Sequence, residues 1–132
     1  MQIVRRDSEK EPAGPPTEQR TATFSGTVYA DAVLDGTAGA AVTSVFFAPG
    51  GRTFWHSHEH GQVLHVLEGR GLVATEGSTP QPISPGDVVW AAPGEVHWHG
   101  GGPGSMLLHL AVSLGHTSWL GPVSDDDYGG GQ

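Results

Sequence analysis

Four side chains in the middle of the chain have the types and the spacing of a metal site. His56, His58 and Gln62 form the pattern H-x-H-x-x-x-Q, and His97 follows in the segment PGEVHWHG. Because a strand points alternate side chains to one face, His56 and His58 should point in the same direction. Gly61 permits a turn that brings Gln62 to the same place. Three imidazole nitrogens and one amide oxygen form a ligand set for a divalent metal ion.

The amide of Gln62 has an electrostatic consequence for such a site. A carboxylate here would cancel one unit of the metal charge, whereas an amide oxygen cancels none. The full charge favours stabilisation of an anionic oxygen or of a departing anion. Four protein ligands on an octahedral ion leave two positions open, for a substrate oxygen and a water. Imidazole suits Zn, Fe, Ni and Cu, while the hard amide oxygen favours Mn or Fe.

Two further histidines are candidates for proton transfer. His109 lies in an apolar segment, with Leu107 and Ala111 as its expected inward neighbours. Since imidazole titrates near neutral pH, His109 is predicted to be a general base, the alternative being a histidine that orients a metal ligand. His99 has the same parity as His97, and it either orients a ligand or substrate or faces solvent.

The two motifs resemble those of the cupin family, whose pattern is G-x5-H-x-H-x3,4-E-x6-G followed by G-x5-P-x-G-x2-H-x3-N. The positions that fit are Gly50, His56, His58, Gly69, Gly86, Gly94 and His97. Gln62 stands in place of the Glu, Ala92 in place of the Pro and Gly101 in place of the Asn. The resemblance covers roughly residues 20 to 128 and implies a cupin double-stranded β-helix, an all-β jelly-roll barrel.

Within that family, the chain resembles the small manganese-type hydroxynitrile lyases. These proteins also use three His and one Gln, and they share the character of FSGTVYAD (24–31), FWHSH (54–58), PGDVVW (85–90), PGEVHWHG (93–100) and HLAV (109–112). The resemblance implies manganese as the cofactor, with iron, zinc, nickel or cobalt as alternatives. It also implies a lyase that cleaves or forms cyanohydrins by Lewis-acid and His-base catalysis.

The same resemblance suggests substrate-binding positions. Thr43, Val45 and Ser113 match places that line the pocket in these lyases, and Thr43 could hold a substrate hydroxyl or nitrile. Phe47 and Trp90 could line an apolar pocket for an aromatic aldehyde, although packing in the core is the more expected role for each. The competing functions are an iron-dependent dioxygenase, a polyketide cyclase or isomerase, and a non-catalytic ligand-binding cupin.

Short apolar segments separated by Gly and Pro turns favour a β-sandwich or barrel. The expected strands cover residues 23–34, 41–48, 53–59, 62–68, 71–75, 88–91, 95–99 and 105–113. Phe24, Val28 and Tyr29 are candidate core residues, and Ser124 is expected to cap one helical turn.

The predicted organisation is one domain over residues 21–128. Residues 1–20 are expected to form a flexible arm, or to include a strand at Met1–Arg5 that pairs with a neighbouring subunit. Residues 129–132 are expected to be a disordered tail. Met106, Leu108, Leu110 and Val112 would form an apolar outer face, which predicts a homodimer or homotetramer.

Composition narrows the function classes. The 132 residues carry a net charge of −8, which argues against nucleic acids and anionic membranes as partners and leaves a small-molecule substrate. The absence of Cys excludes disulfides and thiol catalysis. With no run of about 18 apolar residues and no signal-peptide pattern, a cytoplasmic location is expected.

Overall fold

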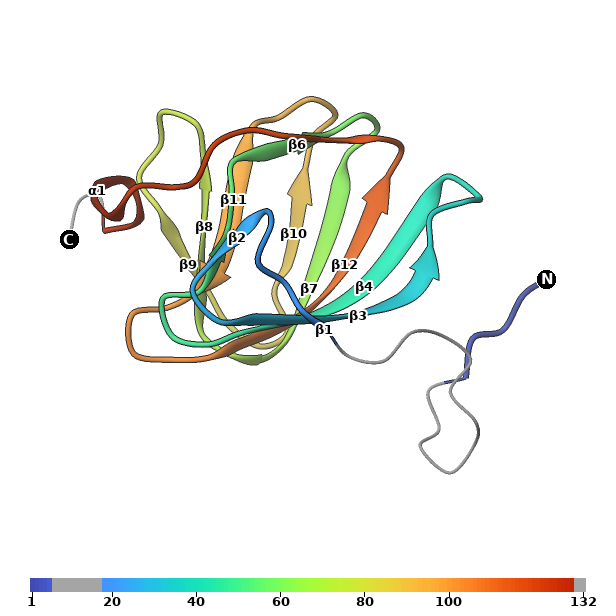
Figure 1. Ribbon diagram of the computed structural model, residues 1–132, viewed down its shortest axis with the longest axis horizontal. Coiled ribbons are helices and arrows are strands. Elements are labelled where there is room, and N and C mark those ends of the chain that lie inside the picture. The colour runs from blue at the N-terminus through green and yellow to red at the C-terminus, as the bar shows by residue number, and fades with distance from the viewer. Residues whose placement is uncertain (6–17, 130–132) are drawn as a thin grey trace.

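The computed structural model describes residues 1–5 and 18–129. Its strands, which lie between residues 18 and 119, form two curled antiparallel sheets (Figure 1). The six-stranded sheet has the order β1-β3-β4-β12-β7-β10. Its strands are β1 (Glu18–Gln19), β3 (Val28–Asp35), β4 (Ala40–Phe47), β12 (Leu107–Leu114), β7 (Gln62–Gly69) and β10 (Val88–Ala91).

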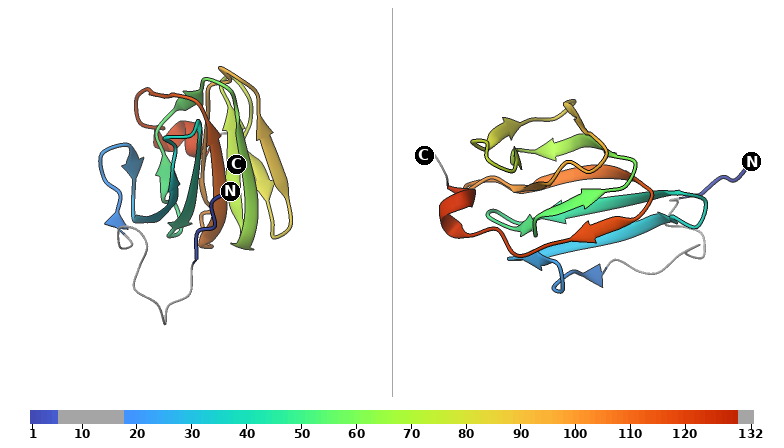
Figure 2. Two further views of the ribbon diagram at one scale, coloured as in Figure 1. Left: turned by 90° about the vertical axis from the view of Figure 1, so that its right-hand side faces the viewer. Right: turned by 90° about the horizontal axis from the view of Figure 1, so that it is seen from above.

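The second sheet has seven strands and faces the first (Figure 2). Five of them run in the order β13-β6-β11-β5-β2, and β8 pairs with both β11 and β9. These strands are β13 (Thr117–Trp119), β6 (His56–His58), β11 (His97–Gly101), β5 (Arg52–Thr53), β2 (Phe24–Ser25), β8 (Gly71–Thr75) and β9 (Gln81–Ile83). The all-β jelly-roll prediction is therefore confirmed.

The core lies between the sheets because inward-facing side chains alternate with outward-facing ones along each strand. On β4, Val45 and Phe47 are buried, and on β12 Leu107, His109 and Ala111 are buried. A second apolar cluster lies under the C-terminal segment and consists of Leu72, Ala74, Trp98 and Val123. The expectation of Leu107 and Ala111 as inward neighbours of His109 is thus confirmed.

The predicted strands all contain strand structure, but the prediction of Tyr29 as a core residue is wrong. Val28 pairs with Phe47 and Tyr29 with Phe46, so that adjacent residues of β3 face opposite sides of the sheet. Val28 is buried and Tyr29 is 39% exposed on the outer face. Phe24 is half-buried on β2 and packs against the core.

The N-terminal arm was predicted to span residues 1–20, yet its last part belongs to the sheet. Glu18–Gln19 forms β1, which pairs with β3 of the same chain. Met1–Arg5 forms no strand in this chain, and Met1 and Ile3 are exposed. The rest of the predicted arm, residues 6–17, and most of the predicted tail, 130–132, lie outside the described residues.

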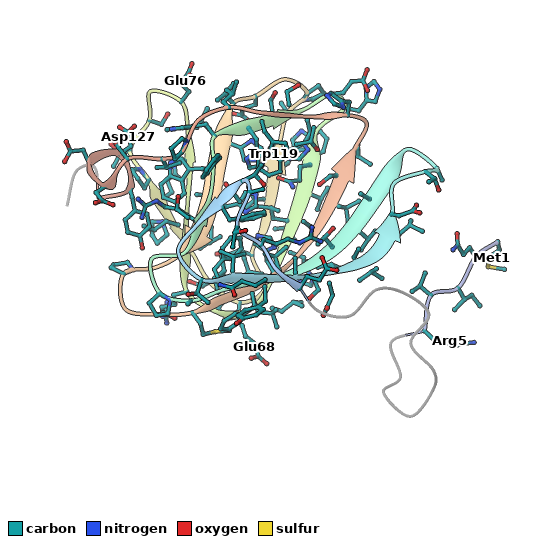
Figure 3. All side chains as sticks on the ribbon, viewed as in Figure 1. Met1, Arg5, Glu68, Glu76, Trp119 and Asp127 are labelled. Carbon is teal, nitrogen blue, oxygen red and sulfur yellow. The ribbon has the colours of Figure 1, made fainter. Side chains whose placement is uncertain are left out.

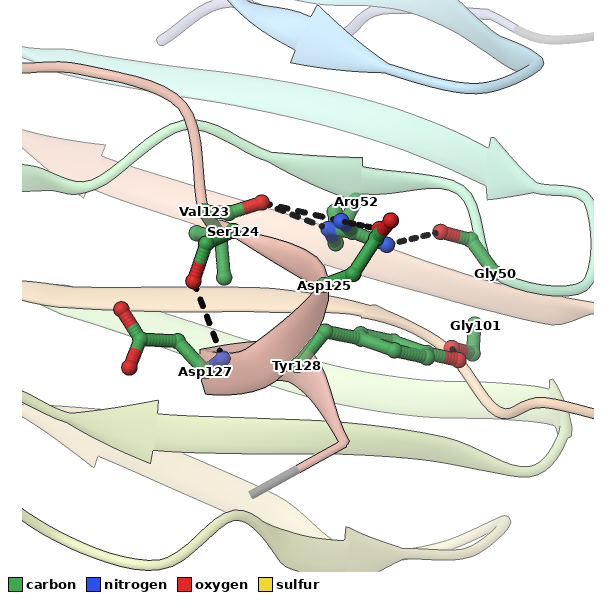
Figure 4. A network of polar contacts seen from close by, with 8 residues as sticks. All are labelled: Gly50, Arg52, Gly101, Val123, Ser124, Asp125, Asp127 and Tyr128. Atoms are coloured by element: carbon green, nitrogen blue, oxygen red, sulfur yellow. Dashed lines mark hydrogen bonds and ion pairs between the residues drawn. The ribbon is translucent and has the colours of Figure 1, made fainter.

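The C-terminal segment is fastened to the barrel by Arg52 (Figure 4). The Arg52 guanidinium donates from Nη2 and Nε to the carbonyl of Val123, at 2.9 and 3.3 Å, and forms an ion pair of 2.9 Å with Asp125. It also lies 4.5 Å from the centre of the Tyr128 ring, whose hydroxyl donates to the carbonyl of Gly101 at 2.7 Å. These contacts fix the path of the chain after β13.

The expected helical turn is present as α1 (Asp125–Tyr128) at one end of the molecule (Figure 1). Its first turn is capped as predicted, because the Ser124 hydroxyl accepts a hydrogen bond of 3.0 Å from the amide of Asp127. Within residues 1–5 and 18–129, no helix has the length and apolar character needed to cross a membrane.

Candidate metal centre and substrate pocket

The four predicted ligands come from three strands and are all buried. His56 and His58 lie on β6, Gln62 begins β7, and His97 begins β11 directly opposite His56. The ring centre of His56 lies 4.3 Å from that of His97 and 4.9 Å from that of His58. The β6–β7 turn and the pairing of β6 with β11 therefore bring the four side chains together.

Each of the three imidazoles is oriented by a hydrogen bond that its Nδ1 atom makes. His56 Nδ1 lies 2.8 Å from the carbonyl of Phe54, and His97 Nδ1 lies 2.9 Å from the carbonyl of Glu95. Because a carbonyl can only accept, both Nδ1 atoms carry hydrogen and both Nε2 atoms present a lone pair. His58 Nδ1 lies 3.0 Å from the hydroxyl of Thr117, and its buried Nε2 has no partner. This is the arrangement that metal-binding histidines need.

Gln62 is oriented by Ser113 on β12. The Gln62 amide nitrogen donates a hydrogen bond of 3.0 Å to the Ser113 hydroxyl, which leaves Oε1 facing His97 Nε2 at 3.0 Å. In this orientation two hydrogen-bond acceptors, an amide oxygen and an imidazole lone pair, face each other in a buried place. A cation beside both atoms would satisfy them, so the donor set fits a divalent metal ion.

His99 also belongs to this cluster. Among the described His, Cys, Asp and Glu side chains, the group close enough to share one metal ion is His56, His97 and His99, whose ligating atoms lie within 4.8 Å of one another. His99 is buried, so the alternative that it faces solvent is wrong. Its Nε2 has no hydrogen-bond partner. The cluster thus offers His99 either as a further ligand or as a group beside the metal.

Burial keeps all five clustered histidines neutral. Desolvation lowers the pKa of His56 to about 3, with repulsion from His97 as the next cause, and lowers the pKa of His58 to about 4. Desolvation also lowers the pKa of His109 to about 4 and the pKa values of His97 and His99 below the usual range. At neutral pH each imidazole is therefore in the form that binds a metal or accepts a proton.

His109 lies behind His99 and does not line the pocket. Its Nε2 is 2.9 Å from His99 Nδ1, and the His109 side chain is fully buried. Phe47 covers the same pair, with its ring centre 5.1 Å from that of His109 and 5.9 Å from that of His99. His109 therefore contacts the pocket-lining His99 through Nε2, and its other ring nitrogen, Nδ1, is buried without a hydrogen-bond partner.

A pocket of about 480 Å³ opens onto the metal centre. Of the predicted substrate-binding residues, Thr43, Val45 and Ser113 line it, together with His56, His58, Gln62 and His99. The other lining residues are Glu18, Gln19, Arg20, Thr21, Ala22, Thr23, Phe24, Ala30, Ala41, Thr53, Ala111, Thr117 and Trp119. Small side chains from the six-stranded sheet thus face the histidines of the other sheet.

Two of the predicted substrate-binding residues, Phe47 and Trp90, do not line this pocket. Phe47 is fully buried in the core, which was its more expected role. Trp90 lies on the outer face, is 54% exposed and does not line the pocket with the histidines. The reason is the register of β10, in which Ala91 pairs with the inward Gln62 and Trp90 pairs with Val63. The Trp90 ring covers Gly61, where an added Cβ would collide with it.

Two residues of β13 complete the site and were missed. Thr117 pairs with His58 and Trp119 with His56, so both side chains lie on the ligand face of β6. The Trp119 ring centre is 4.7 Å from that of His56, and Trp119 lies over the interior of the barrel in Figure 3. No spacing rule links these residues to the histidine motif, because β13 and β6 are distant in sequence.

Comparison with known proteins identifies the family of this chain. Residues 43–110 match the Cupin domain family. The chain is also 40% identical to the (R)-mandelonitrile lyase of Granulicella tundricola over 97% of its own length and 98% of that protein. The chain belongs to the cupin family.

Solved structures of other proteins have a similar fold. A cupin-like protein from Thermotoga maritima is 33% identical, with a TM-score of 0.81 over 89% of this chain and 95% of that one. The polyketide cyclase RemF from Streptomyces resistomycificus matches 97% of this chain and 90% of its own, with a TM-score of 0.64 and 23% identity, a likeness of fold alone. The predicted resemblance to the cupin family is therefore confirmed.

Proposed function

We propose that this cupin is a metal-dependent lyase that cleaves or forms cyanohydrins. The observation that carries the proposal is the donor set of three buried imidazoles and Gln62 Oε1, of which His56, His58 and Gln62 line the pocket. None of these four side chains is negatively charged, so a bound divalent ion would keep its full charge for an anionic oxygen. The 40% identity to an (R)-mandelonitrile lyase over nearly the whole chain supports the same activity.

His56, His58, Gln62 and His97 are the residues proposed to hold the ion, and manganese is the proposed metal. When bound, the ion would act as a Lewis acid toward the cyanohydrin hydroxyl or the aldehyde oxygen. Ser113 and Thr117 would keep Gln62 and His58 in their ligating orientations, because each hydrogen-bonds the ligand at 3.0 Å.

His99 is proposed to be the group that exchanges the substrate proton. It lines the pocket, and its Nε2 has no partner among the protein atoms. In the tautomer with hydrogen on Nδ1, His99 donates to His109 Nε2 and presents the Nε2 lone pair to the substrate hydroxyl. His109 then stabilises the imidazolium that forms, as a positioning residue and not as the base.

The proposed reaction balances with these groups alone. His99 takes the hydroxyl proton, the bond between the carbinol carbon and the nitrile carbon breaks, and its electron pair leaves with cyanide. The oxygen lone pair forms the aldehyde carbonyl, and His99 returns the proton to give hydrogen cyanide. Thr43 faces the same pocket and offers a hydroxyl to the substrate oxygen or nitrile.

The test is cleavage of mandelonitrile under argon by protein loaded with manganese and, separately, with iron. We expect metal-dependent release of benzaldehyde without oxygen, measured by absorbance, and one metal ion per chain by elemental analysis. A lyase needs no oxidant, whereas a dioxygenase does. Failure to release benzaldehyde with any metal, together with oxygen uptake on a diketone, would replace this proposal by the dioxygenase.

We also propose that the protein assembles as a homodimer or homotetramer. The outer face of the six-stranded sheet is apolar across neighbouring strands. Its exposed members are Tyr29, Leu67, Val88 and Trp90, and Leu108, Leu110 and Val112 are half-buried beside them. A large apolar patch of this kind usually marks an interface.

Light scattering at micromolar concentration is expected to give a mass of at least twice 13.7 kDa. Leu110→Asp, on the central strand β12, should shift the mass toward the monomer, because it places a charge in the apolar face. Leu120→Asp is the matched control, since Leu120 is exposed outside that sheet. A single 13.7 kDa species in the unaltered protein would count against this assembly.

A further inference from the structure

Arg20 points into the pocket from the edge of the six-stranded sheet. Glu18 pairs with the inward-facing Ala30, and the amide of Arg20 donates to the carbonyl of the buried Val28 at 2.8 Å. Residues that pair across two strands lie on the same face, so Glu18 and Arg20 face inward while the outward Tyr29 pairs with Gln19. In agreement, Arg20 is half-buried and lines the pocket that holds the histidines.

The Arg20 guanidinium contains a hydrogen-bond donor that no acceptor satisfies. Its Nε is shielded from solvent and has no hydrogen-bond partner. Within the described part of the chain, the ion pairs are Arg52–Asp125 and His60–Glu59, and neither involves Arg20. A shielded guanidinium N–H without an acceptor costs free energy that a bound acceptor would recover.

Arg52, an arginine with a structural role, differs from Arg20 in its hydrogen-bond partners. Its guanidinium donates to the carbonyls of Gly50 and Val123 and to the carboxylate of Asp125. Arg20 lines the pocket, and its Nε has no hydrogen-bond partner. The contrast indicates that the partner of Arg20 is a ligand.

The charges around the pocket limit what that ligand can be. Glu18 and Arg20 are the charged side chains among its lining residues, and Glu18 is exposed. The remaining lining residues are the clustered histidines and Thr, Ser, Ala, Val, Gln and aromatic side chains. Besides the proposed metal ion, the lining therefore offers one fixed positive charge, that of Arg20, to a negatively charged group of a ligand.

We propose that Arg20 binds a carboxylate of the substrate, so that the preferred substrates are cyanohydrins or aldehydes that carry a carboxylate away from the reacting carbon. The planar guanidinium matches a carboxylate in shape and can donate two parallel hydrogen bonds to it. This inference rests on the proposed lyase function and adds the substrate class to it.

The experiment compares the cyanohydrins of benzaldehyde and of 3- and 4-carboxybenzaldehyde in metal-loaded protein. The measured quantity is the ratio of kcat/KM for each carboxylated substrate to kcat/KM for the neutral one. Arg20→Met is expected to lower that ratio about ten- to a hundredfold for the better carboxylated isomer, since it removes a charged hydrogen-bonding partner. Arg20→Lys should give a ratio between those of Arg20→Met and the unaltered protein. The lysine keeps the positive charge but lacks the planar group that donates two parallel hydrogen bonds.

Arg70→Met is the matched control, because Arg70 is exposed and bonded to Ser84 on the surface. Its ratio should equal that of the unaltered protein. An unchanged ratio in Arg20→Met, including an equal loss on both substrates, would overturn the inference.

Calorimetric binding of the carboxybenzaldehydes separates this inference from the lyase function. Weaker binding to Arg20→Met than to Arg70→Met supports the role of Arg20 even if neither substrate is turned over, a result that would overturn the lyase alone. Equal binding to both variants would overturn the role of Arg20 whatever the activity.

Discussion

His58→Ala is expected to remove most of the bound metal and to abolish lyase activity. The substitution deletes a buried Nε2 that has no protein partner, and it also releases the Thr117 hydroxyl from its contact with Nδ1. Loss of a residue that only orients a ligand typically costs about 10- to 100-fold in metal affinity, so loss of the ligand itself should cost at least that much. Elemental analysis after dialysis, and titration against a chelator, measure the effect.

His60→Ala is the matched control for this variant. His60 lies two residues after the end of β6 and is exposed, so its removal should leave metal content and activity unchanged. His99→Ala provides the decisive comparison, because His99 is the third member of the tight group with His56 and His97. If His58→Ala keeps a full equivalent of metal while His99→Ala loses it, then His99 and not His58 is the ligand.

The barrel and the ligand cluster could be predicted because their determinants are local in sequence. Alternation places His56 and His58 on one face, and Gly61 adopts a positive φ of 97° in the turn that leads to Gln62. Two strands, Gly71–Thr75 and Val88–Ala91, have the predicted bounds. Each lies between turn residues and consists mainly of β-forming or small side chains, so local preferences and tertiary pairing agree.

The rest of the site depends on register, which one strand alone does not specify. Trp90 faces outward because Ala91, and not Trp90, is paired with Gln62. Thr117 and Trp119 reach the histidines only through the pairing of β13 with β6, and Arg20 reaches the pocket only through the edge pairing of β1 with β3. Such long-range pairings give no periodic signal in the sequence, and a slip of one residue would reverse every side chain.

The roles of the two paired histidines lead to the second large effect. His99→Ala removes the Nε2 that is proposed to take the substrate proton, and the loss of a general base typically costs about 10²- to 10⁴-fold in rate. The metal content should be retained, because the four proposed ligands are intact. The loss should lie in kcat, with little change in KM, since the proton moves in the transition state.

Replacement of His109 tests the contact of 2.9 Å between its Nε2 and His99 Nδ1. His109→Ala should lower kcat less than His99→Ala does, because the base remains but loses the acceptor that fixes its tautomer and stabilises its protonated form. His109→Gln offers an amide oxygen to the same His99 N–H and should recover part of kcat, which a purely structural loss of packing would not predict. The measurements are single-turnover rates on mandelonitrile under argon, with circular dichroism to confirm the fold of each variant.

If His109→Ala and His109→Gln are both as inactive as His99→Ala, then His109 is itself the base, as its place in the sequence first indicated. If His99→Ala keeps its rate, neither histidine transfers the proton and the proposed mechanism is wrong.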